Sequence, residues 1–206
     1  MSGVDLVAQQ DLDASASSIT FSELPSADYD FFELIGTCRS NYTGNTTFAY
    51  RDPLILRFGV SDSIISANNK YEWSEVSVGN NTTSWNGDGE RASSGGTRTS
   101  YMRVGCIPDD DNVSGGAELF RGSMVTIRLS GLASGQYPVV HSTISFAGGR
   151  DPAPADNLRD GQSATVGRFV DSDAITDLEL QPLNGSQFES SAGEASFILL
   201  GYKGSL

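Results

Sequence analysis

Histidine and cysteine are scarce in this chain of 206 residues, which holds one histidine, His141, and two cysteines, Cys38 and Cys106. Catalysis by histidine normally requires a nucleophile and an orienting carboxylate within hydrogen-bond reach. The valines that precede His141 supply neither. The cysteines lack a C-x-x-C spacing, so we expect buried packing, although a disulfide stays open because their Cα separation is unknown. We therefore predict no enzyme and no cofactor.

Positive charge is also scarce, because 13 Lys and Arg residues face 26 Asp and Glu residues, for a formal charge of −13. Nucleic-acid binding needs clustered cations, so we expect this protein not to bind nucleic acid. No apolar run reaches the roughly 20 residues of a membrane span. The N-terminal residues MSGVDLVAQQ have neither a basic start nor an apolar region, so we expect no secretion by a standard signal.

Alternation of apolar and polar residues is what the chain has instead. Thr176, Leu178 and Leu180 alternate with Asp177 and its polar neighbours, which is typical of a strand with one buried and one wet face. The terminal stretch 196–202 reads SFILLGY and is apolar on both parities, so both of its faces must be covered.

Short strands separated by turn signals recur along the whole chain, without an amphipathic helix or an internal repeat. The pattern predicts an all-β fold, an antiparallel, jelly-roll-like β-sandwich of about eight to ten strands. Residues 17–206 would form this single domain. Residues 1–16 have no sustained periodicity and would form an extended N-terminal arm, anchored on a neighbouring subunit or frayed. Its anchors would be Val4, Leu6 and Val7.

Several segments carry a resemblance to a known family. They read SDAITDLEL at 172–180, SFILLGYK at 196–203 and SSITFSELP at 17–25, with further strands at 28–40 and 54–58. Together they resemble jelly-roll-like virion proteins of tailed phages, which occur as capsid decoration proteins, head spikes or tail-fibre tips. The resemblance covers about residues 15–203 and implies a fold, a virion setting and a homotrimer. It identifies no catalytic residue.

A surplus of apolar side chains predicts a subunit interface, because a sandwich has only one inner face per sheet. The predicted interface residues are Tyr29, Phe31, Ile35, Phe197 and Leu199.

The polar middle of the chain is the longest candidate loop region, and loops on a rigid sandwich often carry recognition. Asn86-Gly87-Asp88-Gly89 predicts a hairpin turn. Tyr71, Trp73 and Trp85 are candidate glycan-facing residues, with interface or core packing as the alternative. Asp109-Asp110-Asp111-Asn112 could offer oxygens to Ca²⁺ but lacks EF-hand spacing. Two carboxylates could serve in glycoside hydrolysis only if the fold placed them at the distance that this reaction requires.

These observations lead to two hypotheses. The first is a capsid decoration (cement) protein on the outer surface of a phage head, made in the host cytoplasm, with itself and the major capsid protein as partners. The second is the receptor-binding tip of a tail fibre or head spike that recognises host surface polysaccharide. The absence of a long shaft or coiled coil favours the first.

Overall fold

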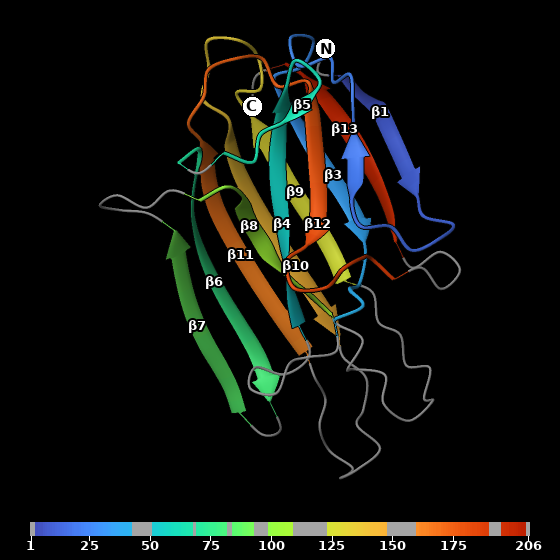
Figure 1. Ribbon diagram of the computed structural model, residues 1–206, viewed down its shortest axis with the longest axis vertical. Helices are drawn as coiled ribbons and strands as arrows, with labels where there is room; N and C mark the ends of the chain where they lie inside the picture. Colours follow the sequence, from blue (N-terminus) through green and yellow to red (C-terminus); the bar gives the residue numbers. More distant parts are fainter. Residues whose placement is uncertain are drawn as a thin grey trace.

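Strands make up all of the regular structure that the computed structural model describes, as Figure 1 shows. The described residues are 3–42, 51–67, 69–81, 84–92, 99–108, 123–147, 160–189 and 195–204. Within them lie thirteen strands and no helix, and every strand pairing is antiparallel. The predicted all-β antiparallel sandwich is confirmed, with more strands than expected.

The larger sheet has eight strands and contains both ends of the described chain. Its order is β1 (Gly3–Asp11), β13 (Ser196–Lys203), β3 (Phe31–Thr37), β9 (Ser123–Ser130), β10 (Val139–Ala147), β11 (Asp160–Phe169), β6 (Tyr71–Asn81) and β7 (Ser84–Ala92). The terminal strand β13 therefore lies inside the sheet, between β1 and β3. Most of the segment expected to form an arm is the edge strand β1.

The smaller sheet packs against one face of the larger one. Its order is β2 (Ile19–Phe21), β12 (Asp177–Pro182), β4 (Arg51–Val60) and β5 (Ser63–Ile64), and β8 (Met102–Pro108) pairs with β4. A bulge interrupts the pairing of β8 with β4, and Gly105 lies next to it with φ of +132°. Strand β8 also contacts β6, β10 and β11 of the larger sheet, so it helps to close the sandwich.

The core lies between the two sheets and follows the period-2 pattern of the strands. In β9 the side chains of Val125, Ile127 and Leu129 have no exposed surface, whereas Met124 and Arg128 face solvent. Burying a side chain of this size contributes about 1.5–3 kcal/mol. Because the core cluster draws on both sheets, each sheet depends on the other for its buried face.

Tyr71 fastens the two sheets together at one end of the core. Its ring lies 4.9 Å from that of Phe169 and 6.3 Å from that of Phe58, measured between centroids. Its hydroxyl donates to the carbonyl of Ile65 at 2.7 Å and accepts from the N–H of Phe58 at 2.9 Å. Burial raises the pKa of this phenol. Tyr71 is therefore a core residue of β6, so the core alternative predicted for it is confirmed and the glycan-facing one is wrong.

The predicted hairpin turn at Asn86-Gly87-Asp88-Gly89 is also wrong, because this segment lies inside β7. Asn86 pairs with Gly79 and Gly87 pairs with Val78 of β6. Glycine and asparagine favour turns but do not require them. Here the backbone pairing with β6 continues through them.

Candidate functional site

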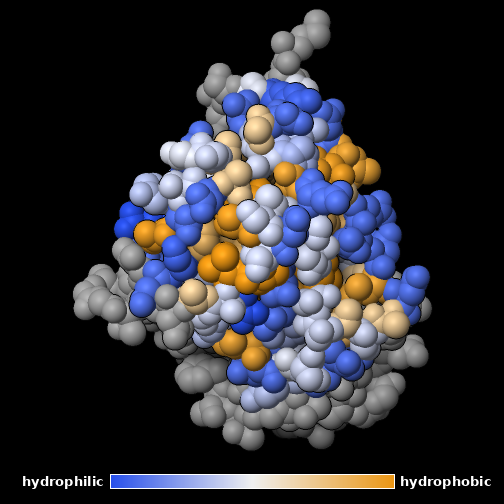
Figure 2. Space-filling view, turned by 45° about the horizontal axis from the view of Figure 1, so that its top comes forward, coloured by the Kyte–Doolittle hydropathy of each residue, from blue (hydrophilic) through white to orange (hydrophobic). Residues whose placement is uncertain are grey.

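The outer face of the larger sheet is the face that points away from the core and from the smaller sheet. On β1, β13 and β3 this face is apolar, and the register places Leu6 beside Leu200 and Ile198 beside Ile35. We call it the outer apolar face, and its members are Val4, Leu6, Phe31, Ile35, Ile198, Leu200 and Tyr202. Val4 and Leu6 are 55% and 61% exposed. Figure 2 shows hydrophobic side chains near the middle of the face in view and at its upper right-hand edge, among hydrophilic ones.

The terminal strand has two apolar sides, as predicted. The side that points outward, however, is not the one predicted to form the interface. Phe197 and Leu199 have no exposed surface and belong to the core. Their neighbours Ile198 and Leu200 are half-buried on the outer side. Phe197 and Leu199 are therefore wrong as interface residues.

Of the other residues predicted for the subunit interface, Phe31 and Ile35 lie on the outer apolar face. Tyr29 lies elsewhere. Its ring packs edge-on against the buried Phe32, with centroids 5.3 Å apart.

The charges within the outer apolar face are paired with each other. The Nε–H of Arg128 donates to Glu33 Oε1 at 2.7 Å, and the Tyr202 hydroxyl donates to Glu33 Oε2 at 2.9 Å. The rings of Tyr202 and Phe31 stack with centroids 4.3 Å apart. The Glu33 carboxylate raises the pKa of Arg128 and of Tyr202. A carboxylate that is 8% exposed thus adds no unpaired charge to the face.

A second ion pair joins β1 to β13. Lys203 Nζ lies 3.2 Å from Asp5 Oδ2 and 4.7 Å from the centroid of the Tyr29 ring. The Tyr29 hydroxyl donates to the same oxygen of Asp5 at 3.0 Å. These contacts lower the pKa of Asp5 and raise that of Lys203. Because Val7 also packs against the core, the N-terminal segment is held at both its charged and its apolar side chains.

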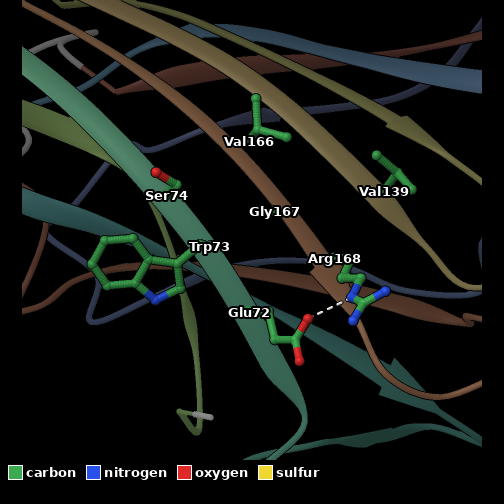
Figure 3. Close-up of a pocket in the computed structure, with 7 residues that line it drawn as sticks. All are labelled: Glu72, Trp73, Ser74, Val139, Val166, Gly167 and Arg168. Carbon is green, nitrogen blue, oxygen red and sulfur yellow. Dashed lines mark hydrogen bonds and ion pairs between the residues drawn. The ribbon is translucent and has the colours of Figure 1, made fainter. Parts of the chain in front are cut away.

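A shallow hollow of about 350 Å³ lies on the same side of the sheet, over β6, β10 and β11. We call it the outer hollow, and it is lined by Glu72, Trp73, Ser74, Val139, Val166, Gly167 and Arg168. Figure 3 shows Val139 and Val166 on neighbouring strands and the Arg168 side chain turned toward Glu72. Arg168 Nε donates to Glu72 Oε2, which raises the pKa of the guanidinium. An apolar floor thus borders a fixed ion pair.

A buried polar cluster occupies the inner side of β6, where the alternation would place another apolar residue. Glu75 is 2% exposed, and its Oε2 lies 3.0 Å from Arg103 Nε. The Cys106 thiol donates to Glu75 Oε1 at 3.4 Å. The Arg103 guanidinium carbon lies 5.3 Å from the centroid of the Trp73 ring. This ion pair neutralises charge that would otherwise be costly to bury.

Sequence reasoning missed this cluster, although one signal was present. Glu75 stands on the same parity as the aromatic side chains of Tyr71 and Trp73. Trp73 is itself 8% exposed and belongs to the core, so the core alternative predicted for it is confirmed, although the residue also borders the outer hollow. The side chain of Trp85, the third predicted residue, lies outside the described residues, as does the acidic run at 109–112.

The remaining sequence candidates have structural surroundings. Both cysteines are free and buried, as expected. The Cys38 N–H donates to Ser123 Oγ at 3.1 Å, and burial raises the pKa of its thiol to about 12. His141 is exposed on β10, opposite Val166 and Arg128.

Neither a metal-binding cluster nor a membrane-spanning helix occurs in the described part of the chain. No group of three His, Cys, Asp or Glu side chains there is arranged to hold a metal ion. No helix in it has the length and apolar character to cross a membrane.

Comparisons with known proteins do not assign this chain to a family. No protein-family model matches the chain, and no curated protein matches it in sequence. Among solved structures, the CBM2 module of an evolved Dit protein from Lactobacillus casei BL23 phage J-1 has a TM-score of 0.21 and 10% sequence identity. That likeness covers 92% of this chain and 70% of the other. A TM-score of this size does not establish a common fold, so the likeness supports no statement about function.

Proposed function

We propose that this protein is a structural component of a tailed-phage particle, a capsid decoration (cement) protein that forms a homotrimer on the outer surface of the head. There it would bridge major capsid subunits through many modest contacts. The observation that carries the proposal is the outer apolar face. Its side chains extend over three adjacent strands, and exposed apolar surface of this kind marks association sites.

The charge distribution supports contact between identical copies at this face. Copies of a chain with a formal charge of −13 repel one another. On the outer apolar face, however, Glu33 is paired with Arg128. Copies that meet here bury apolar side chains with little like-charge repulsion.

Strand β1 would add a second contact. A long edge strand offers unpaired backbone groups to a neighbour. Strand β1 has nine residues, and Val4 and Leu6 are exposed on it. The capsid shell or a second copy would therefore bind the free backbone edge of β1.

Cosedimentation with phage heads that lack the protein tests the decoration role. Saturable binding at a copy number comparable to the capsid lattice is expected, together with a trimer mass in light scattering. The Leu200→Asp variant should fold and fail to bind, with Val76→Asp as the matched control, since Val76 is exposed on the same sheet far from β13. A trimer that ignores the heads would contradict the proposal.

A second candidate is the receptor-binding tip of a tail fibre or head spike. The observation in its favour is the outer hollow, whose mixed lining suits a polar ligand. Cosedimentation with phage heads separates the two functions, because a receptor-binding tip should not bind the capsid lattice.

A further inference from the structure

We propose that the outer hollow is a binding site for a single uncharged hexopyranose unit of a glycan. The inference does not depend on the decoration role; it rests on the second candidate function and names the ligand class of that site. A hexopyranose has an apolar face of C–H groups and a rim of hydroxyls that both donate and accept hydrogen bonds. The outer hollow offers the counterpart of each within about 350 Å³, near the lower end of the usual range for small-ligand sites.

The apolar part of the hollow comes from two valines on adjacent strands. Val166 is 53% exposed, whereas its neighbours Thr165 and Gly167 on β11 are buried on the inner side of the strand. Val139 stands opposite Arg168 in the pairing of β10 with β11. Their methyl groups form a small, open floor that suits a C–H face, since a wholly apolar ligand would need deeper enclosure.

The polar part comes from an ion pair and a serine hydroxyl. Arg168 donates through Nε to Glu72, which leaves the two terminal nitrogens of the guanidinium for other acceptors. The Arg168 side chain is 58% exposed and that of Glu72 is 19% exposed. Ser74, exposed and opposite Val166, adds a hydroxyl that donates and accepts. Fixed groups lose little conformational freedom on binding.

The strand order argues against a peptide as the occupant. Strands β6, β10 and β11 are each paired on both sides, so they offer no free backbone edge for strand addition. Charge argues against an anionic ligand, because Glu72 neutralises Arg168 in a chain of formal charge −13. An uncharged sugar that uses side-chain hydrogen bonds remains as the occupant that fits.

Saturation-transfer NMR with the methyl pyranosides of glucose, galactose and mannose tests the site on the full chain. Transfer to the ring C–H protons of at least one is expected, with a dissociation constant on the order of 1 mM because the hollow is shallow. Val166→Asn should weaken binding roughly tenfold. Val76→Asn is the matched control, because Val76 is 61% exposed on the adjacent strand and does not line the hollow.

A second pair of variants tests the polar rim. Arg168→Gln should reduce saturation transfer, whereas Arg128→Gln should leave it unchanged, since Arg128 is paired with Glu33 outside the hollow. All four positions are exposed, so the variants should keep the wild-type thermal midpoint. Absence of transfer from all three pyranosides would overturn the site, as would equal losses in the Val166 and Val76 variants. Neither result would bear on capsid binding.

Discussion

Asp52 is a buried carboxylate that fixes a loop distant from it in the sequence. It has no exposed surface and accepts hydrogen bonds from Ser40 Oγ at 2.7 Å, Asn184 N–H at 2.9 Å and Gly185 N–H at 2.7 Å. A Cβ at Gly185 would collide with Ser40 Oγ. The Asn-Gly pair that reads as a turn is thus also the binding partner of a buried charge.

Asp52→Asn should lower the free energy of unfolding by about 2–4 kcal/mol, because hydrogen bonds to a charged group are stronger than neutral ones and an amide nitrogen would face backbone donors. Urea unfolding followed by tryptophan fluorescence measures the loss. Asp62→Asn is the control, since Asp62 is an exposed turn residue with φ of 62°, a conformation that asparagine also adopts. Equal stabilities for the two variants would contradict this account.

The Cys38 thiol should resist alkylation in the folded protein. Its pKa is raised to about 12 by burial, and the thiolate is the reactive form. Iodoacetamide at about pH 8 should leave Cys38 unmodified in peptide mass spectra and modify it fully in urea. Labelling at the same rate in both conditions would mean that the site opens readily.

Residue types and the alternation along the strands predicted many of the buried side chains. They did not predict which side is buried in a strand that is apolar on both sides. Val140, Ile144 and Phe146 are buried on one side of β10 as expected. In β13 both parities are apolar, and only the neighbouring strands decide which one faces the smaller sheet. Proximity to polar loops suggests a surface position for Tyr71 and Trp73, yet both side chains are large and mostly apolar, so the core gains most from burying them.

At the scale of elements, exposed carboxylates take part in attaching β1 to β13. Asp5 and Asp11 both lie on it, and contacts with Lys203 and Ser196 lower the pKa of each in the folded state. A carboxyl group with a lowered pKa stabilises the fold above its unfolded value, and this contribution is lost as the pH falls through the folded value.

Acidification should therefore loosen β1 before the rest of the sheet. Amide signals of residues 3–11 in ¹H–¹⁵N spectra should shift or broaden as the pH falls below the ordinary aspartate pKa of about 3.9, while those of β9 in the sheet centre stay unchanged. An Asp5→Asn, Asp11→Asn double variant should lose this selective response. Simultaneous loss of β1 and β9 signals would indicate global acid unfolding instead.

The sequence does not identify β1 because its pattern is irregular. Its pairing with β13 shifts register between Leu6 and Ala8, so the parity of buried side chains changes within the strand. At an edge position, Val4 and Leu6 also stay exposed. A short sequence without sustained alternation therefore predicts an arm, although its backbone is paired.

At the scale of the whole molecule, two adjacent leucines separate folding from assembly. Leu199→Asp would bury a charge among core side chains, at a cost of several kcal/mol that approaches the whole stability of a typical domain. Leu200→Asp places the charge on the half-buried outer apolar face. We expect an insoluble first variant and a folded monomer for the second, measured by circular dichroism and light scattering. A Leu200→Asp variant with the wild-type mass would move the interface elsewhere.

The pairing of Gly3 with Lys203 brings the first and last strands of the described chain side by side. Strand β3 has β9 as an earlier partner but pairs on its other side only after β13 has been made, and among the described strands β2 pairs only with the late strand β12. During synthesis the early strands leave the ribosome long before their partners exist, so this part of the larger sheet cannot form until β13 has been made. The nascent chain must keep its early strands from aggregating. Chaperone demand during expression should therefore fall when a circular permutant joins residues 3 and 203 by a short linker and opens the chain elsewhere.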